Sequence, residues 1–108
     1  MKNNENLTFG EAIEALKQGK KVARKGWNGK NMYLFLITRN ILGKCGCQFE
    51  FKRYFQDIIQ YVDKDDFMDS GHIKIDDVIA MRTAQKTVQL GWLASQADIL
   101  AEDWMVVN

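Results

Sequence analysis

The sequence predicts an α+β fold, a small antiparallel sheet of about five strands with an N-terminal helix and one or two shorter helices. One strongly punctuated helical pattern stands near the start of the chain. Several short apolar runs follow it, each bounded by glycine or polar residues. The length also fits, because 108 residues suffice for one domain with its own hydrophobic core. We therefore expect residues 1–108 to form a single domain, in which residues 1–7 are a flexible leader.

The first helix is predicted to begin after Thr8. Thr8 and Glu11 form the capping-box pattern, a hydroxyl at the N-cap and a carboxylate three residues later. Apolar residues then recur at spacings of three and four, which predicts one buried stripe: Phe9, Ala12, Ile13 and Leu16. Gly19 is expected to end the helix, because glycine adopts the left-handed C′ conformation at little cost.

Two strands are predicted to follow as an antiparallel hairpin, at residues 20–25 and 31–38. The second strand contains Met32–Ile37, a run without polar alternation, which is typical of a buried strand. The turn between them, residues 26–29, is bracketed by glycines and carries Trp27.

The middle of the chain is less regular. Glycines and the two cysteines predict a loop after residue 40, and apolar residues at helical spacing favour a helix over residues 51–62. An acidic turn over residues 63–71 closes this part.

The last third returns to clear patterns. Ser95 and Asp98 repeat the capping box, with aspartate in the role of the third residue, and predict a short helix that ends near Glu102. The other expected elements are strands at residues 72–82, 87–92 and 104–107.

Composition excludes several classes of function. Fifteen Lys and Arg against fourteen Asp and Glu leave a net charge of +1, too low for a global binder of DNA or RNA polymers or of membrane surfaces. The longest wholly apolar run, Met32–Ile37, is far shorter than the ~20 residues of a membrane helix. The polar N-terminus lacks the apolar stretch of a secretory signal, and Cys45 and Cys47 are too close for an ordinary disulfide, so we predict a cytoplasmic protein.

Charge is distributed unevenly. Residues 17–30 hold six Lys and Arg and no acid, whereas residues 57–77 hold seven Asp and two Lys. The two segments are either solvated faces or complementary patches in a homo-oligomer.

Metal binding and catalysis have weak support. Cys45, Cys47 and the single histidine, His72, stand at no recognised zinc spacing, and we predict no metal and no cofactor. The motifs of nucleophilic hydrolases, zinc proteases and phosphate loops do not occur. Carboxylates near the C-terminus still leave carboxylate chemistry open: Asp98, Glu102 and Asp103.

The tryptophans point to binding instead. Trp104 alternates with apolar residues and is predicted to lie in the core. Trp27 lies in the glycine-bracketed turn, and Trp92 follows Gly91 at the end of a strand. A tryptophan in such a place either covers the core or offers a stacking surface for a base. Basic side chains near Trp27 and the predicted helix N-terminus at Ser95 would suit an anion, although Asp98 would oppose one. The residues thus indicate a pocket for a flat, anionic ligand.

Two stretches resemble a phage family closely. Residues 8–29 and 91–104 are similar to the start and end of the Thoeris anti-defence proteins of the second type, and Met81–Ala84 matches the strand that precedes the second motif. Residues 40–72 match poorly. That region is variable in the family, and we therefore describe it as a variable insertion.

The resemblance implies a sponge and not an enzyme. Members of the family sequester the cyclic ADP-ribose isomer (glycocyclic ADP-ribose) that the Thoeris sensor makes, so that the effector receives no signal. They form homotetramers with ligand pockets at subunit contacts, and some also hold cyclic di- or trinucleotides at a separate site. The resemblance implies action in the host bacterial cytoplasm during phage infection.

The same resemblance suggests the ligand-binding residues: Phe9, Arg24, Trp27, Asn28, Trp92, Ser95 and Asp98. Trp27 or Trp92 would stack on adenine, Asn28 and Ser95 would address phosphate or amide edges, and Asp98 would accept hydrogen bonds from ribose hydroxyls. Arg24 is a candidate phosphate partner. Phe9 and Ser95 also have purely structural readings, in the helix stripe and the cap.

The hypothesis predicts the effect of one substitution and leaves two alternative functions open. Trp27→Ala should abolish binding with a nearly unchanged Tm unless Trp27 belongs to the core. Two alternatives remain, an enzyme that degrades a cyclic nucleotide signal and a protein-interaction module suggested by the aromatic stripe in residues 49–62.

Overall fold

The computed structural model describes residues 4–27, 31–38, 61, 63, 65 and 76–108. The chain divides into two compact units, residues 1–37 with 78–108, and residues 38–77. All helices and strands given below lie in the first unit. The loop, helix and acidic turn predicted over residues 40–72 fall almost wholly outside the described residues. The single domain with a variable insertion stays a prediction.

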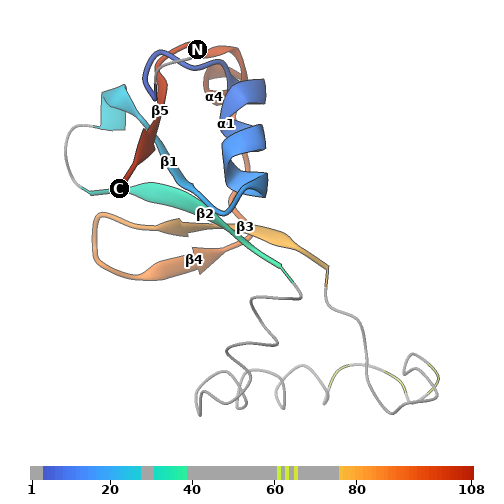
Figure 1. Cartoon of the computed structure of the whole chain (residues 1–108). Helices are drawn as coiled ribbons and strands as arrows, with labels where there is room; N and C mark the ends of the chain where they lie inside the picture. Colours follow the sequence, from blue (N-terminus) through green and yellow to red (C-terminus); the bar gives the residue numbers. More distant parts are fainter. Residues whose placement is uncertain (1–3, 28–30, 39–60, 62, 64, 66–75) are drawn as a thin grey trace. The chain divides into compact units, whose positions relative to one another are not determined.

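A five-stranded antiparallel sheet, in the order β4-β3-β2-β1-β5, forms the first unit (Figure 1). Together with the N-terminal helix and one shorter helix, it confirms the predicted α+β class. The predicted hairpin is present as β1 and β2, which pair with Val22 opposite Leu34. The strands are β1 (Lys21–Arg24), β2 (Tyr33–Ile37), β3 (Val78–Arg82), β4 (Val88–Leu90) and β5 (Trp104–Val107).

Helix α1 (Phe9–Lys17) begins and ends as its sequence predicts. The Glu11 N–H donates to the Thr8 hydroxyl at 3.2 Å, and the Thr8 N–H donates to the Glu11 carboxylate at 2.9 Å. These bonds satisfy two donors that a helix start leaves free. Gly19 follows with φ +86°, the left-handed conformation expected at a helix end.

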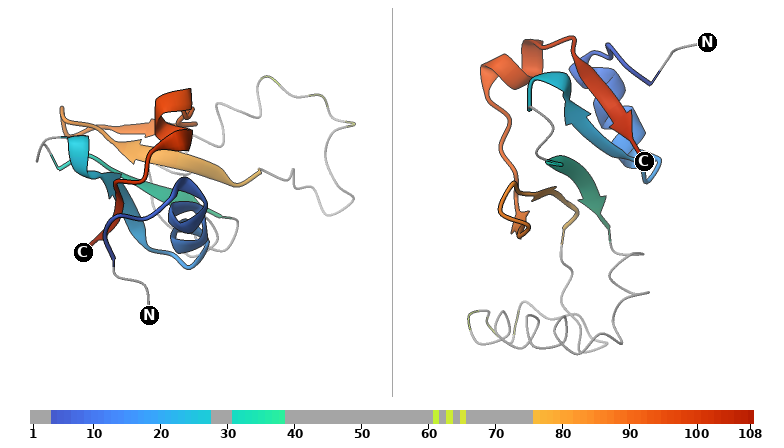
Figure 2. Two further views of the ribbon diagram at one scale, coloured as in Figure 1. Left: turned by 90° about the horizontal axis from the view of Figure 1, so that it is seen from above. Right: turned by 90° about the vertical axis from the view of Figure 1, so that its left-hand side faces the viewer.

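The core lies between α1 and one face of the sheet (Figure 2). Val22, Leu34 and Met81 are neighbours across three strands and point to this face. Val22 and Leu34 are fully buried, which contributes roughly 1.5–3 kcal/mol for each side chain. The helix adds its own buried residues, Ala12, Ala15 and Leu16.

The N-terminal segment closes one edge of the sheet. Leu7 exchanges backbone hydrogen bonds with Trp104, and the Val106 N–H donates to the Asn4 carbonyl at 2.8 Å. Leu7 is also buried, with 6% of its surface exposed. Residues 4–7 therefore belong to the edge beside β5 and not to a flexible leader, because Leu7 brings an apolar side chain into the core.

Strand β3 starts later than predicted. Asp76 and Asp77 precede the strand and are exposed, as expected for residue types that are rare in strands. Helix α4 (Gln96–Leu100) has the predicted Ser95–Asp98 capping box but ends at Leu100, before the expected Glu102.

Strand β4 is shorter than predicted because the chain bulges at Gly91. The N–H groups of Gly91 and Trp92 both donate to the Ile79 carbonyl, at 3.1 and 2.8 Å. Two residues thus oppose one, as in a β-bulge with glycine in the left-handed conformation, here at φ +81°. The bulge breaks the alternation of side chains, so that Trp92 packs against the core beside α1.

Gly91→Ala should lower the free energy of unfolding by about 1–2 kcal/mol, because an L-residue pays that cost in the left-handed region. Space is not the cause, since no atom lies within 4 Å of an added Cβ. Gly10→Ala is the matched control, because Gly10 lies in α1 and its added Cβ would meet only the Thr8 hydroxyl at 3.9 Å. Urea unfolding measures both. Equal stability of Gly91→Ala and the wild type would contradict this assignment.

Candidate functional site

Three aromatic rings surround the indole of Trp104, which is fully buried. The ring centroids of Trp27, Phe9 and Trp92 lie 5.5, 5.6 and 6.1 Å from that of Trp104. Trp27 and Trp92 also meet each other, at 6.4 Å with an interplanar angle of 68°. The four rings come from the start of α1, the turn after β1, the bulge after β4 and the start of β5. We call Phe9, Trp27, Trp92 and Trp104 the aromatic cluster.

The geometry of the cluster is favourable. Trp27 and Trp92 approach Trp104 with interplanar angles of 78° and 85°, and edge-to-face pairs of this kind contribute about 0.5–1.5 kcal/mol beyond their buried area. Both rings are half-buried, whereas Trp104 is inaccessible. Trp27 and Trp92 therefore serve the core and still present part of their surface to solvent.

The sequence left open whether Trp27 covers the core or offers a stacking surface, and the structure shows that it packs on the core. It lies in a short 3-10 helix, η1 (Lys25–Trp27), and packs on the core cluster. We now expect Trp27→Ala to lower the Tm, contrary to the expectation of a nearly unchanged Tm, because it removes the edge-on contact with Trp104.

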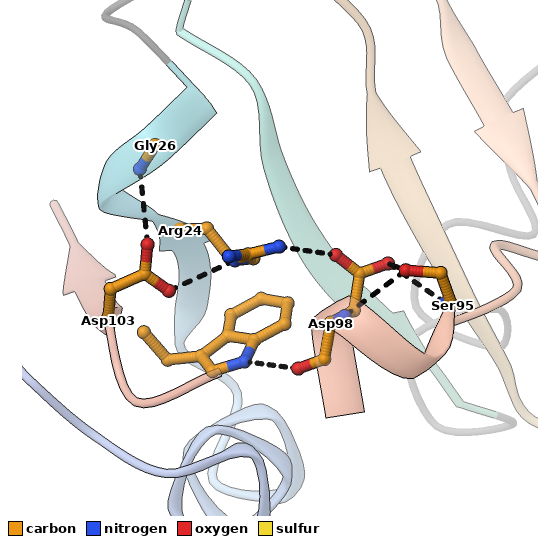
Figure 3. Close-up of polar contacts among 6 residues, drawn as sticks. Arg24, Gly26, Ser95, Asp98 and Asp103 are labelled. Atoms are coloured by element: carbon orange, nitrogen blue, oxygen red, sulfur yellow. Dashed lines mark hydrogen bonds and ion pairs between the residues drawn. The ribbon is translucent and has the colours of Figure 1, made fainter. Parts of the chain in front are cut away.

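Asp98 connects the aromatic cluster to a polar network. The Trp104 Nε1–H donates to the Asp98 carbonyl at 2.9 Å, which satisfies the one polar group of the buried indole. The Asp98 carboxylate accepts from the Ser95 N–H and hydroxyl, both at 2.9 Å, and from Arg24 Nη1 at 3.0 Å (Figure 3).

Arg24 bridges two carboxylates. Its Nε donates to Asp103 Oδ1 at 3.0 Å, while Nη1 binds Asp98. The second oxygen of Asp103 accepts from the Gly26 N–H at 3.3 Å, and the Asp103 carbonyl accepts from the Lys25 N–H at 3.0 Å. Asp103 thus contacts three consecutive residues that lead into Trp27. We call Arg24, Ser95, Asp98 and Asp103 the ion-pair network.

Electrostatics stabilise the charged forms of the network. Burial alone would raise the pKa of Asp98, but hydrogen bonds from Ser95 and Arg24 and the Arg24 charge outweigh it and lower the pKa. Burial likewise opposes the lowered pKa of Asp103, which results from Arg24 and the Gly26 N–H. The hydrogen bond to Asp103 is the main cause that raises the pKa of Arg24.

Most of the predicted site residues therefore come together. Phe9, Trp27 and Trp92 lie in the aromatic cluster, and Arg24, Ser95 and Asp98 lie in the ion-pair network. Asn28 lies outside the described residues. The contacts give Arg24 and Ser95 structural roles, as a bridge between carboxylates and as a helix cap. Their predicted contacts with a ligand stay predictions.

Sequence reasoning missed the role of Asp103. It is 79 residues from Arg24, and no local pattern connects the two. Trp104 was expected in the core, and its complete burial confirms this. The sequence does not predict that Trp104 lies at the centre of the other rings, because this position depends on how three strands and α1 meet.

A separate shallow depression of about 330 Å³ lies beside α1. It shares no residue with the aromatic cluster or the ion-pair network. Its charged residues are two carboxylates and one amine, and none of its lining residues has an aromatic ring on which a base could stack. The lining residues are Asn4, Leu7, Glu11, Glu14, Ala15, Gln18, Lys20 and Val106.

In the described part of the chain, no three or more His, Cys, Asp or Glu residues are grouped so that they could hold a metal ion. None of the helices described there is long and apolar enough to span a membrane.

Comparison with known proteins gives a clear relationship. A family model described as the Thoeris anti-defense 2-like domain matches residues 7–107. The chain is also similar to a curated protein, Thoeris anti-defense 2 of Bacillus phage SP01. The two are 37% identical over 102 residues, which cover 94% of this chain and 96% of that protein.

Acid should weaken the fold through the ion-pair network. Because the folded-state pKa values of Asp98 and Asp103 are below the ordinary 3.8, their contribution to stability is present above that value and is lost as the pH falls through the folded-state values. We expect this contribution to be constant from pH 7 to about 5 and to decline below about 4.

Urea unfolding at a series of pH values measures the effect. Asp103→Asn should be less stable at pH 7 and should lose less stability on acidification than the wild type. Glu14→Gln is the control, since Glu14 is an exposed residue of α1. An Asp103→Asn curve parallel to that of the wild type would refute the assignment.

Proposed function

The chain belongs to the Thoeris anti-defense 2-like family, and from this premise we propose that it counters the Thoeris immunity of bacteria during phage infection. We propose further that it acts as a sponge, which binds the cyclic ADP-ribose-type signal (glycocyclic ADP-ribose) and holds it without cleaving it. The effector of the immune system is then left without its signal.

The aromatic cluster is the observation that carries the sponge proposal. Trp27 and Trp92 are half-buried and held in fixed positions by Trp104. A rigid aromatic ring loses little entropy when a base stacks on it, and such stacking is worth about 1–3 kcal/mol per base. Adenine is the part of the ligand that would use these rings.

The ion-pair network supplies polar groups beside the rings. A guanidinium has five N–H donors, and Arg24 uses one on Nε and one on Nη1 for the two carboxylates. Its remaining donors suit a phosphate. The exposed Ser95 hydroxyl and the remaining acceptor capacity of Asp98 suit hydroxyl groups of ribose. In this proposal Arg24 both holds the site together and contacts the ligand.

Sequestration fits the electrostatics better than acid–base catalysis does. A general acid needs a pKa near the working pH, whereas the pKa values of Asp98 and Asp103 are lowered from an already acidic range. Both carboxylates also accept several hydrogen bonds in the network. An enzyme that degrades the signal is the rival proposal, and it would have to draw on Glu102 or His72.

Other parts of the proposal follow the family resemblance alone. The protein would assemble as a homotetramer with ligand pockets at the subunit contacts. Cyclic di- or trinucleotides would bind at a separate site, and the host bacterial cytoplasm would be the place of action. A sponge must also bind more tightly than the effector, and a nanomolar Kd corresponds to about −12 kcal/mol.

Recovery of the ligand separates the sponge from its rivals. The purified protein is incubated with the glycocyclic ADP-ribose isomer, free ligand is filtered away, and the retained protein is denatured by heat. Chromatography should then show intact ligand in near-stoichiometric amount. A converted product would establish an enzyme. An empty protein fraction would show that this isomer is not the ligand, and the same assay would then be run with cyclic di- and trinucleotides.

Two neighbouring substitutions test the aromatic cluster in the same assay. Trp92→Ala should raise the Kd of the ligand, measured from retention at a series of ligand concentrations, about 5- to 150-fold, because the loss of one stacked base costs about 1–3 kcal/mol. Leu93→Ala should retain the ligand like the wild type, because Leu93 is 89% exposed and lies outside the cluster. Circular dichroism shows whether each variant is folded. Unchanged retention by folded Trp92→Ala would exclude Trp92 from the site.

A further inference from the structure

The two edges of the sheet differ. At one edge, β5 is covered by residues 4–7, whose backbone pairs with Trp104 and Val106. At the other edge, β4 pairs with β3 on one side and has no strand partner on its other side among the described residues. An open edge exposes unpaired N–H and C=O groups to any other extended chain.

The pairing of β3 with β4 determines which backbone N–H and C=O groups of β4 point away from the sheet. The Thr83 N–H donates to the Thr87 carbonyl, and the Gly91 N–H donates to the Ile79 carbonyl. Hydrogen-bonded pairs alternate along an antiparallel ladder, so Gln89 directs its backbone groups toward β3. Val88 and Leu90 therefore direct theirs away from β3, where a second strand would bind.

Exposed apolar side chains gather at this edge. Val88 and Leu90 are 58% and 43% exposed, although strand residues of this type are usually buried. Of the six large apolar residues that are exposed in the described chain, Val88 and Leu90 lie on β4, whereas Ile99 and Leu100 lie on α4.

This edge carries neither charge nor proline. Natural edge strands often use charged residues or proline to avoid pairing, and residues 87–97 contain neither, although β4 is short and ends in the bulge at Gly91. A neutral strand is compatible with a second copy of itself, because two identical charged strands would repel each other, whereas two identical neutral ones do not. Nothing in this segment offers a charge that would select a different, oppositely charged partner.

We propose that β4 is the surface through which two copies of this chain join, by antiparallel pairing of β4 with β4 of a second copy. The proposal rests on the self-association suggested under the proposed function and names its surface. With Gln89 on the two-fold axis, Val88 pairs with the partner subunit's Leu90 and exchanges both backbone hydrogen bonds with it. Symmetry repeats this pair, and the two sheets become one continuous sheet.

Light scattering tests the proposal on the full chain. The wild type should have at least twice the 12.5 kDa mass of one chain. Val88→Lys combined with Leu90→Lys places like charges directly opposite across the two-fold axis, and should halve the mass of the wild type. The matched control, Ile99→Lys with Leu100→Lys, also converts two exposed apolar residues and should keep the mass of the wild type.

Hydrogen exchange gives a second readout that needs no substitution. The amides of Val88 and Leu90 should exchange slowly in the wild type, as the amide of Gln89 should, because a second strand binds them. Fast exchange at both positions would overturn the proposal. So would a single-chain mass for the wild type, an unchanged mass for the double lysine variant, or an equal loss in the control.

Failure of this inference is distinguishable from failure of sequestration. A wild type that retains the cyclic ADP-ribose isomer at the mass of one chain overturns the β4 interface and the proposed assembly, and leaves sequestration standing. A wild type that pairs through β4 and retains no ligand leaves the interface standing and overturns the sponge.

Discussion

The indole of Trp104 has to be buried completely and still have a hydrogen-bond partner for its N–H. Its position in β5 places it against α1, where Phe9 covers one side. The Asp98 carbonyl accepts its N–H, which ties the short helix α4 to the sheet. Trp27 and Trp92 fill the remaining sides. Four segments that are distant in sequence are therefore positioned by one side chain, and the candidate site is a consequence of core packing.

The ion-pair network positions the polar side of the site, as Trp104 positions the aromatic cluster. Arg24 lies in β1 opposite Trp104, so that its guanidinium emerges between Asp98 and Asp103. Removing this cation would leave two carboxylates close together in a partly buried place, which is costly. The network also holds the turn that carries Trp27. A ligand that uses the exposed parts of Trp27 and Trp92 would meet a surface that is already organised, and organisation before binding lowers the entropy cost of binding.

Local features of this fold could be predicted from the sequence, and long-range ones could not. The capping boxes at Thr8 and Ser95 and the helix end at Gly19 depend on residues within four positions of each other, and the structure confirms them. The bulge at Gly91 depends on the register of β3 and β4, which no local pattern records. The pairing of Arg24 with Asp103 likewise requires the three-dimensional fold. Six of the seven site residues suggested by family resemblance lie in the aromatic cluster or the ion-pair network, because family motifs record such long-range constraints.

In the proposed site, Trp104 is a buried support, and Trp27 and Trp92 are the accessible rings. The three tryptophans give three indole N–H signals in a nitrogen–proton NMR spectrum. One signal, that of Trp104, should resist exchange with solvent. Addition of the cyclic ADP-ribose isomer should shift the signals of Trp27 and Trp92 and leave Trp104 protected. Rapid exchange of the Trp104 indole, or ligand binding that shifts neither of the other two signals, would contradict the account.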